Sequence, residues 1–418
     1  MPVSLRPSAV AELLRPGMQV FLPGMSGESD IFYSLVREKP ESADGVRFIV
    51  VQFPGINRSD FLSLHERARQ RGYFMMPELR SGLRQGRFEL LPVDHPGIVR
   101  DIRSLGSIDL LLAHVSPPDE HGMCSLGVSC DFVPVAWPLA KLRFAHVNAK
   151  MPRTRGSFQI PYSAFDYAFE ADQEPRCYDA GMADSGMRHH ADLVAGLVRD
   201  GDTVEFGIGK LQTSIVHALA AHQNLQVWSG MATTPIVELL DRGVVRGNAS
   251  IQLGCALGDR EFYDRCSDDD SFYFRPASET HDVGRVSSIK NFCAINSAVE
   301  VDLLGQVNSD VVNGKLVAGV GGLPPFISGA LASAGGRSVI ALPSTTSSGK
   351  HSRIVTRLCR PGAVAVNRSS ADYVVTEHGV ASLRGASIQA RAEALIGIAS
   401  PQWREQLASE WHELLHQL

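Results

Sequence analysis

The feature that most constrains the fold of this chain is a pattern that occurs twice: an apolar strand, a glycine turn and a helix. The first copy is MQVFLPGMSGESDIFYSLV at residues 18–36, and the second is DTVEFGIGKLQTSIVHAL at residues 202–219. A second pair of segments, DLLLAHVSPPDEHGMCSLG at 109–127 and NFCAINSAVEVDLLGQVNS at 291–309, follows the two copies at about the same distance. Repetition on this scale predicts two related domains.

Apolar runs rich in β-branched residues predict buried strands, and they alternate with stretches of helical periodicity such as 214–221 and 235–242. Alternation of this kind favours α/β domains with mainly parallel, open sheets. The predicted strands cover 47–53, 108–115, 203–206, 338–342, 363–366 and 372–375.

The boundary between the predicted domains falls near residue 180, with an N-terminal α/β domain at 1–180 and a C-terminal α/β domain at 181–418. The segment RCYDAGMADSG at 176–186 has the small and polar residues that are typical of a linker. A cleft between two such domains is the usual place for a small ligand. We therefore expect the functional site there.

Composition excludes several classes of partner and cofactor. The 418 residues carry a net charge of -5, which predicts no basic surface for nucleic acid. No apolar run reaches the roughly 18 residues of a membrane-spanning helix, and the first 20 residues predict a short amphipathic helix rather than a signal peptide. The seven cysteines are scattered without a C-x-x-C pair, which indicates reduced thiols of a cytoplasmic protein and no metal site. The chain also lacks H-E-x-x-H, G-x-S-x-G and Walker motifs.

The turn Gly207-Ile208-Gly209 follows a predicted strand and opens a predicted helix. Glycines let the chain turn tightly and bring backbone N–H groups close to a ligand. The start of a helix adds partial positive charge, which suits an oxyanion or a phosphate. We expect the amides of Gly207 and Gly209 to line such a site, although a plain tight turn is the alternative.

A second cluster of glycines and polar residues lies in AGVGGLPPFISGA at 318–330 and SVIALPSTTSSGKHSRIV at 338–355. Hydroxyls, backbone amides and one or two cations together fit a pyrophosphate or a pantetheine chain, and a polar surface loop is the alternative. The residues that carry this chemistry are Gly319, Gly321, Gly322, the hydroxyls at 344–348, Lys350 and Arg353.

Taken in order, the chain resembles the acetyl-CoA hydrolase/4-hydroxybutyrate CoA-transferase family over nearly its whole length. The segments that carry the resemblance are SPPDEHGMCSLG at 116–127, VNAKMPRTRG at 147–156, the glycine turn at 207, INSAVEVDLLGQVN at 295–308, GVGG at 319–322, LPSTTSSGKHSRIV at 342–355 and VTEHGVASLRG at 375–385.

The resemblance implies a CoA-transferase-like fold and an enzyme that acts on acyl-CoA thioesters, with coenzyme A as substrate or product, no metal and a homodimeric assembly. It also implies that the second half of the chain binds coenzyme A. The residues expected to contact it are Gly319, Gly321, Gly322, Ser344, Lys350, Ser352 and Arg353.

One position departs from the family pattern. After the glycine turn the family has His-Thr-Glu-Met or a near variant, and its glutamate is the covalent nucleophile that forms a glutamyl-CoA thioester. Here the same place reads Trp228-Ser229-Gly230-Met231. Because Gly230 has no side chain, we expect this route to be closed and a small cavity to open where the carboxylate would have been.

Glu28, in the first-half counterpart of the glycine turn, is the first candidate for a carboxylate that activates an acceptor in place of the missing glutamate. The alternative is that Glu28 is a routine residue of a helix N-terminus, where the helix dipole favours a carboxylate. The acidic groups at 116–122, 300–302 and 377–378 are predicted to be mainly structural.

The leading hypothesis is transfer of the acyl group to water or another acceptor without a glutamyl-CoA intermediate. The alternatives are CoA transfer through another carboxylate, a biosynthetic acyltransferase or cyclising enzyme, and a protein that binds CoA thioesters without turning them over.

Overall fold

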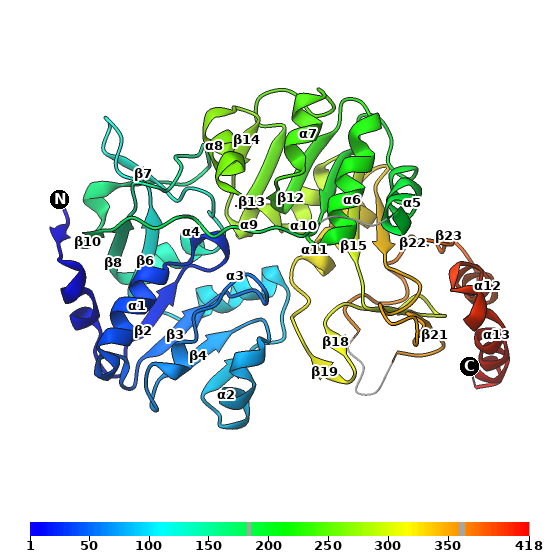
Figure 1. The fold of residues 1–418 in the computed structure, drawn as a ribbon, viewed down its shortest axis with the longest axis horizontal. Coiled ribbons are helices and arrows are strands. Elements are labelled where there is room, and N and C mark those ends of the chain that lie inside the picture. Colours follow the sequence, from blue (N-terminus) through cyan, green and yellow to red (C-terminus); the bar gives the residue numbers. More distant parts are fainter. Residues whose placement is uncertain (182–184, 359–363, 418) are drawn as a thin grey trace. The chain divides into compact units, whose positions relative to one another are not determined.

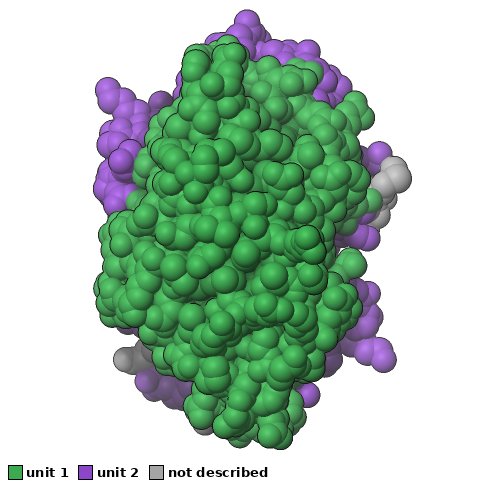
Figure 2. Space-filling view, turned by 90° about the vertical axis from the view of Figure 1, so that its left-hand side faces the viewer, with its two compact units in different colours: residues 1–179, 247–280, 317–319 green, residues 180–246, 281–316, 320–418 purple. Residues whose placement is uncertain are grey.

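The structure is a computed structural model that describes residues 1–181, 185–358 and 364–417 (Figure 1). Cys359, Ala363 and part of the predicted linker lie outside the described residues. Contacts along the chain divide it into two compact units, coloured separately in Figure 2. Unit 1 consists of residues 1–179, 247–280 and 317–319, and unit 2 of residues 180–246, 281–316 and 320–418. Neither unit is a continuous stretch of sequence, and the domain boundary drawn at 180/181 stays a prediction.

Unit 1 is built on a fully parallel sheet of eight strands within its described residues. Its strands, in spatial order, are β1 (Val3–Ser4), β10 (Tyr167–Glu170), β8 (Ala140–Val147), β6 (Ile108–Val115), β2 (Gln19–Leu22), β3 (Arg47–Val50), β4 (Arg69–Gly72) and β5 (Phe88–Leu90). The central strand β6 is apolar and buried along nearly its full length, as expected for a strand covered on both faces.

The helices of unit 1 begin where the sequence supplies capping residues. The Ser29 side chain accepts the Phe32 N–H at the start of α1, and the Asp94 side chain accepts the Gly97 N–H at the start of α3. The helices and remaining strands of unit 1 are α1 (Asp30–Glu38), α2 (Arg80–Arg84), α3 (His95–Ser104), β7 (Met123–Ser125), α4 (Val133–Ala136), β9 (Gln159–Pro161), β13 (Ile251–Leu257), α8 (Arg260–Asp268), β14 (Phe272–Phe274) and α9 (Ala277–Thr280). The N-terminal helix predicted for the first 20 residues is a short 3-10 helix at Pro7–Leu13.

Unit 2 contains strands that pair side by side in a sheet. Neighbouring strands are parallel, except for the last pair, which is antiparallel. In spatial order they are β12 (Gln226–Thr233), β11 (Thr203–Phe206), β15 (Phe292–Ser297), β20 (Arg337–Ala341), β22 (Tyr373–Thr376) and β23 (Gly379–Ser382). The helices are α5 (Ser185–Ala195), α6 (Lys210–Ala218), α7 (Ile236–Asp241), α10 (Val283–Ser288), α11 (Leu323–Ala332), α12 (Ile388–Ile398) and α13 (Pro401–Leu415). Short strands complete it: β16 (Glu300–Asp302), β17 (Val307–Asn308), β18 (Val311–Val312), β19 (Lys315–Leu316) and β21 (Ile354–Val355).

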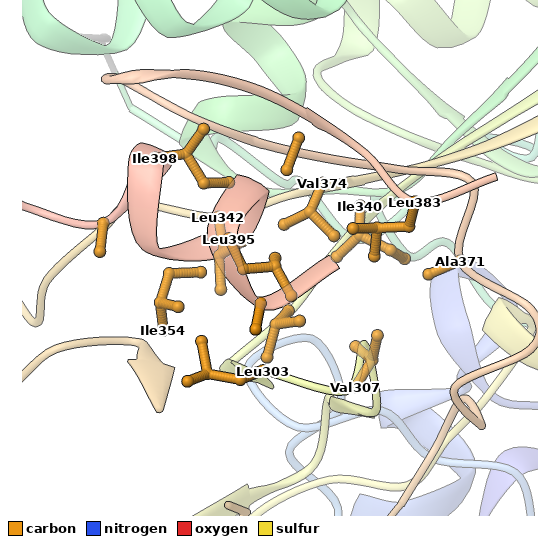
Figure 3. Packing of buried hydrophobic residues seen from close by; sticks show 14 of the residues in the cluster. Leu303, Val307, Ile340, Leu342, Ile354, Ala371, Val374, Leu383, Leu395 and Ile398 are labelled. Carbon is orange, nitrogen blue, oxygen red and sulfur yellow. The ribbon is translucent and has the colours of Figure 1, made fainter. Parts of the chain in front are cut away.

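The core of unit 2 joins the sheet to the C-terminal helices. Side chains from β20, β22, α12 and the short strands meet in one apolar cluster, part of which Figure 3 shows. Its members include Leu342, Val374 and Leu395, each fully buried, and burial of one such side chain contributes about 1.5–3 kcal/mol. This packing fixes the strand ends from which the loops of unit 2 emerge.

The predicted α/β class with large parallel sheets is confirmed. The strand predicted at 363–366 is wrong for its described part, because Val364 is 49% exposed and only an isolated bridge between Val307 and Val366 forms there. Val366 is 4% exposed, so the segment alternates from an exposed to a buried residue and forms one bridge instead of a strand, which periodicity alone does not reveal.

Candidate functional site

The carboxyl ends of the parallel strands of unit 2 carry the glycine turn and the polar loops that the sequence singled out. Open parallel sheets place their ligands at this edge, where strands give way to loops and helix N-termini. Strand β11 ends at Phe206, and helix α6 begins after the three residues 207–209. The candidate site is therefore assembled around the end of β11 and its neighbours β12 and β15.

The turn at 207–209 requires glycine at one of its two glycine positions. Gly209 has a φ of +104°, which L side chains rarely adopt, and it is the N-cap of α6 without any side-chain cap. The amides of the first turn of α6 therefore have no capping side chain, the arrangement that favours an anion. Gly207 has room for a side chain, since the closest atom to a Cβ there would be Gln212 Cγ at 3.9 Å.

Gln212, in the first turn of α6, is a buried amide with unused hydrogen-bonding capacity. Its Nε2 donates to the Ser297 hydroxyl at the end of β15 over 3.0 Å. Its Oε1 has no hydrogen-bond partner among the residues that the structure describes, although the side chain is only 1% exposed. A buried acceptor without a donor is uncommon in proteins and marks a place where a ligand or water can bind.

Position 230 lies in the middle of β12. Successive side chains of a strand alternate between faces, so Gly230 shares a face with Trp228, which packs in a cluster with Phe326. A Cβ atom on Gly230 would lie 2.8 Å from both Cε1 and Nε2 of His281. The cavity predicted beside Gly230 is therefore wrong: the imidazole of His281 takes up the space where a side chain at position 230 would begin.

His281 was not among the candidates identified from the sequence. Its side chain is 4% exposed, and its ring lies on that of Phe326, with centroids 4.6 Å apart and planes inclined by 47°. A Cβ on Gly322, the N-cap of α11, would lie 2.6 Å from Nε2 and 2.9 Å from Cδ2 of the same ring. Two glycines on different elements thus leave room for one imidazole.

The GVGG segment has several structural tasks. Gly319 belongs to unit 1, where a Cβ would come within 2.6 Å of the Tyr73 carbonyl oxygen, and Ala318 accepts a hydrogen bond from the Met75 N–H. Gly321 has a φ of +59°, and Gly322 lies against His281. These close contacts account for Gly319, Gly321 and Gly322 without a ligand, and their predicted contact with coenzyme A stays a prediction.

A buried carboxyl group lies just before the glycine turn. Glu205, on β11, is 3% exposed and accepts a hydrogen bond from Asn296 Nδ2 on β15 over 2.7 Å. Burial raises the pKa of the Glu205 carboxyl to about 8, and the hydrogen bonds from Asn296 and the Ile295 backbone act against that change. At neutral pH this carboxyl group is mainly protonated.

The polar loop at 344–353 holds its residues in different environments. Ser344 is fully buried, and its N–H and hydroxyl both donate to the Glu377 carboxylate, at 2.9 and 2.5 Å. Arg353 is half-buried and donates from Nε to the Thr345 carbonyl and from Nη1 to the Val299 carbonyl. Burial lowers the pKa of Arg353. Lys350 is exposed.

A groove of about 870 Å³ in unit 2 runs along part of this loop. Ser352 and Arg353 line it, together with side chains of α13 such as Trp403 and Glu410. Ser344 and Lys350 are not among its lining residues. Of the four polar coenzyme A contacts predicted in this loop, the groove therefore brings together Ser352 and Arg353 only.

Glu28 is held firmly within unit 1. Its carboxylate is 2% exposed, lies 2.5 Å from Nη2 of Arg176, and accepts hydrogen bonds from Gln52 Nε2 and the N–H groups of Arg58 and Ser59. Glu28 precedes α1, whose N-cap is Ser29. These contacts describe a carboxylate that positions a turn, and its catalytic role stays a prediction.

Two stacked histidines lie behind the same turn of unit 1. The rings of His114 and His146 are 4.2 Å apart and nearly parallel. The Ser29 hydroxyl lies 2.9 Å from Nδ1 of His146, and Asn148 Nδ2 lies 3.0 Å from Nε2 of His114. Burial lowers the pKa of His146 to about 4 and holds that of His114 well below its usual value. Both rings are neutral at neutral pH.

Comparison with known proteins points to the same family as the sequence motifs. The family model described as the acetyl-CoA hydrolase/transferase N-terminal domain matches residues 5–177, and the model of the corresponding C-terminal domain matches residues 258–411. The chain is 33% identical over 424 residues to a 4-hydroxybutyrate coenzyme A transferase of Clostridium kluyveri, a match that covers 96% of this chain and 95% of that protein.

Solved structures show the same fold. RipA from Yersinia pestis superposes with a TM-score of 0.91 at 26% identity, covering 99% of this chain and 97% of that one. A 4-hydroxybutyrate CoA-transferase from Porphyromonas gingivalis gives a TM-score of 0.81 at 28% identity, covering 98% of this chain and 97% of that one.

Proposed function

This chain belongs to the acetyl-CoA hydrolase/transferase family, and from that premise we propose that it passes the acyl group of an acyl-CoA thioester to water without a glutamyl-CoA intermediate. It is an enzyme of the acyl-CoA hydrolase or CoA-transferase type, as its relatives are. What we propose beyond this is that the site of unit 2 supports hydrolysis rather than CoA transfer.

The observation that carries the proposal is the environment of position 230. Gly230 has no side chain, and two atoms of the His281 ring lie 2.8 Å from the position that a Cβ would take. A covalent route needs a nucleophile at this place to take the acyl group and then CoA. With no carboxylate there, the simplest acceptor for the acyl group is water.

The start of α6 supports stabilisation of the oxyanion that forms when water adds to the thioester carbonyl. Gly209 leaves the N-terminal amides of the helix without a side-chain cap, and the Gln212 acceptor beside them indicates room for a polar ligand. One well-placed donor contributes about 3 kcal/mol to such a step. We assign the amides at 207–209 to this role.

The polar loop supports binding of the nucleotide end of coenzyme A. Ser352 and Arg353 line the groove of about 870 Å³, and the exposed Lys350 lies in the same loop. An arginine and hydroxyl groups are suitable donors to phosphate oxygens. We also keep a homodimer and a cytoplasmic location as predictions.

In the proposed reaction the oxygen of water forms a bond to the thioester carbon. The bond from that carbon to sulfur then breaks, and CoA leaves as a thiolate that takes up a proton. The products are free CoA and a carboxylic acid, which ionises at neutral pH. No metal, oxidant or reductant takes part.

The test is release of CoA from acetyl-, butyryl- and longer acyl-CoAs, followed with a thiol reagent in the presence and absence of acetate, in water enriched in oxygen-18. We expect release without acetate and one heavy oxygen in each acid formed. A requirement for acetate, with the CoA found on the acceptor, would refute hydrolysis and restore CoA transfer. Binding of CoA by calorimetry without any release would instead identify a protein that binds thioesters only.

A further inference from the structure

Helix α13 forms one wall of the groove in unit 2. The side chains that line the groove recur along this helix every three or four residues, so they form a stripe on a single face of it. The stripe is about 16 Å long, because each residue of a helix adds about 1.5 Å. Its members are Trp403, Gln406, Leu407, Glu410, Glu413 and Leu414.

Trp403 gives this wall an aromatic surface. The side chain is half-buried and packs against the apolar cluster that includes Leu407 and Leu414. Its Nε1 is buried and has no acceptor among the residues that the structure describes. A ring fixed on an apolar core in this way suits stacking against a second planar ring, and an indole N–H without a partner suits an acceptor atom on that ring.

The opposite wall comes from the loop at 346–357 and from the tip of the β18–β19 hairpin. Arg353 is held in place there, since its Nε and Nη1 donate to the carbonyls of Thr345 and Val299. Its Nη2 has no hydrogen bond or ion pair within the described part of the chain. One arm of the guanidinium fork is therefore left for a ligand, and an arginine in this position suits a phosphate oxygen.

The charges of the groove argue against a bare phosphate or pyrophosphate as its ligand. Two arginines line it, Arg353 and Arg357. Three carboxylates line it as well, those of Glu300, Glu410 and Glu413. Carboxylates repel an anion and accept hydrogen bonds from N–H and O–H groups. The groove therefore suits a ligand with a phosphate at one end and a planar group that bears hydrogen-bond donors at the other.

We infer that α13 recognises the adenosine part of coenzyme A, with the adenine ring stacked on Trp403 and a phosphate of the same nucleotide bound by Arg353. The inference rests on the proposed function, which puts the nucleotide end of an acyl-CoA in this groove, and it adds the residues that read the base. The adenine amino group donates a hydrogen bond to Gln406, and the ribose hydroxyls donate to Glu410.

Gln406 and Glu410 are well placed for these contacts. They lie about one and two helical turns after Trp403, and helix side chains lean toward the N-terminus, which here means toward the indole ring. Gln406 Nε2 donates to Glu410 Oε1 over 2.7 Å, which leaves Oε1 of Gln406 as an acceptor. The carboxylate of Glu410 keeps further lone pairs for the ribose.

These contacts predict an effect on binding and none on the chemical step. The adenosine is joined to the reacting thioester through the whole pantetheine arm, so its contacts are the same in the bound substrate and in the transition state. Removing them should raise KM and the Kd for CoA and leave kcat unchanged.

The test measures by calorimetry the binding of four ligands to the full-length protein: CoA, adenosine 3′,5′-bisphosphate, pantetheine and pyrophosphate. We expect the wild type to bind the nucleotide alone, and to bind pyrophosphate more weakly. Trp403→Leu should raise the Kd of CoA and of the nucleotide by about 5–100-fold and leave that of pantetheine unchanged. Trp403→Phe keeps a ring for stacking and should stay within about threefold of the wild type.

Further readouts separate recognition of the nucleotide from packing. In Trp403→Leu the KM for an acyl-CoA should rise, whereas the KM for the matching acyl-pantetheine should not change. Adenosine 3′,5′-bisphosphate should quench the tryptophan fluorescence of the wild type and not that of Trp403→Phe. Arg353→Gln should make the Kd of the nucleotide less dependent on salt. Glu405→Gln, at an exposed position of α13 outside the groove, is the matched control and should behave as the wild type throughout.

Three results would overturn the role of Trp403. They are a nucleotide Kd of Trp403→Leu within about threefold of the wild type, a pantetheine Kd that rises as much as that of CoA, or a fall in kcat with KM unchanged. The quenching experiment needs only the wild type and the phenylalanine variant, so it decides the question if the leucine variant does not fold.

Failure of this inference differs from failure of the proposed hydrolysis. A wild-type protein that binds the nucleotide and releases no CoA from any acyl-CoA would refute hydrolysis and leave the adenosine site standing. A wild-type protein that releases CoA and does not bind the nucleotide would do the reverse.

Discussion

Replacing Glu205 by glutamine should stabilise unit 2 by about 3 kcal/mol at pH 7. The carboxyl group is 3% exposed, and burial raises its pKa from 4.5 to about 8. The folded protein therefore keeps a proton that the unfolded chain has already released at neutral pH. Glutamine has nearly the same shape, can accept the hydrogen bond from Asn296 Nδ2, and has no proton to lose.

The sign and the size of the effect follow from proton linkage. Between pH 4.5 and about 8 the folded state binds one more proton than the unfolded state, so the free energy of unfolding falls as pH rises. The fall is about 1.4 kcal/mol for each pH unit. At pH 7, about 2.5 pH units above the unfolded pKa, the accumulated cost is about 3.4 kcal/mol, and at pH 5.5 it is about 1.4 kcal/mol.

The assay is urea unfolding at pH 5.5 and 7, followed by the fluorescence of tryptophans such as the buried Trp228 in unit 2. The unfolding free energy of Glu205→Gln should exceed that of the wild type at both pH values, and the difference should be at least about twice as large at pH 7 as at pH 5.5. Glu405→Gln, at an exposed position of α13, is the matched control and should show no such gain. A Glu205→Gln variant that is less stable than wild type at both pH values would show that the carboxyl group is ionised in the folded state.

Three further predictions concern packing and buried charge. Gly230→Ala should cost about 1–3 kcal/mol in chemical denaturation because its Cβ meets the His281 ring, and the cost should vanish in a His281→Ala background. Because burial holds the pKa of His146 at about 4, the unfolded state binds more protons than the folded state below pH 6.5. Calorimetry should therefore show that unit 1 loses about 3 kcal/mol of stability between pH 6.5 and 4, and a folded variant with an uncharged residue at position 146 should not show this loss. Arg176→Met should cost about 3–5 kcal/mol by leaving the Glu28 carboxylate buried without its cation, and adding Glu28→Gln should recover part of that stability.

Local sequence rules account for the fold and for the glycine turn. Strand β6 was predicted with its observed bounds, because six of its eight residues are apolar and such a run is most favourably placed in a buried sheet. Gly209 was predicted to open a helix, and its φ of +104° shows why glycine is needed there. These features depend on neighbours within a few residues.

The arrangement around His281 could not be predicted in this way. His281 lies 51 positions after Gly230 and 41 before Gly322, and only tertiary packing, such as the cluster that joins Trp228 to Phe326, brings the three together. The sequence offered one indirect signal, a glycine in the middle of an apolar strand, which often marks a close approach by another group. It could not say which group approaches, so a cavity was expected instead.

The division into units has a consequence for synthesis on the ribosome. The eight-stranded sheet of unit 1 ends its last strand at Glu170 and can form early, but the segments 247–280 and 317–319 join that unit much later. Unit 2 waits longer still, because β23 reaches Ser382. For most of its translation the nascent chain therefore holds incomplete units with exposed strand edges, the condition in which a chaperone matters most and in which slower elongation should raise the yield of active protein.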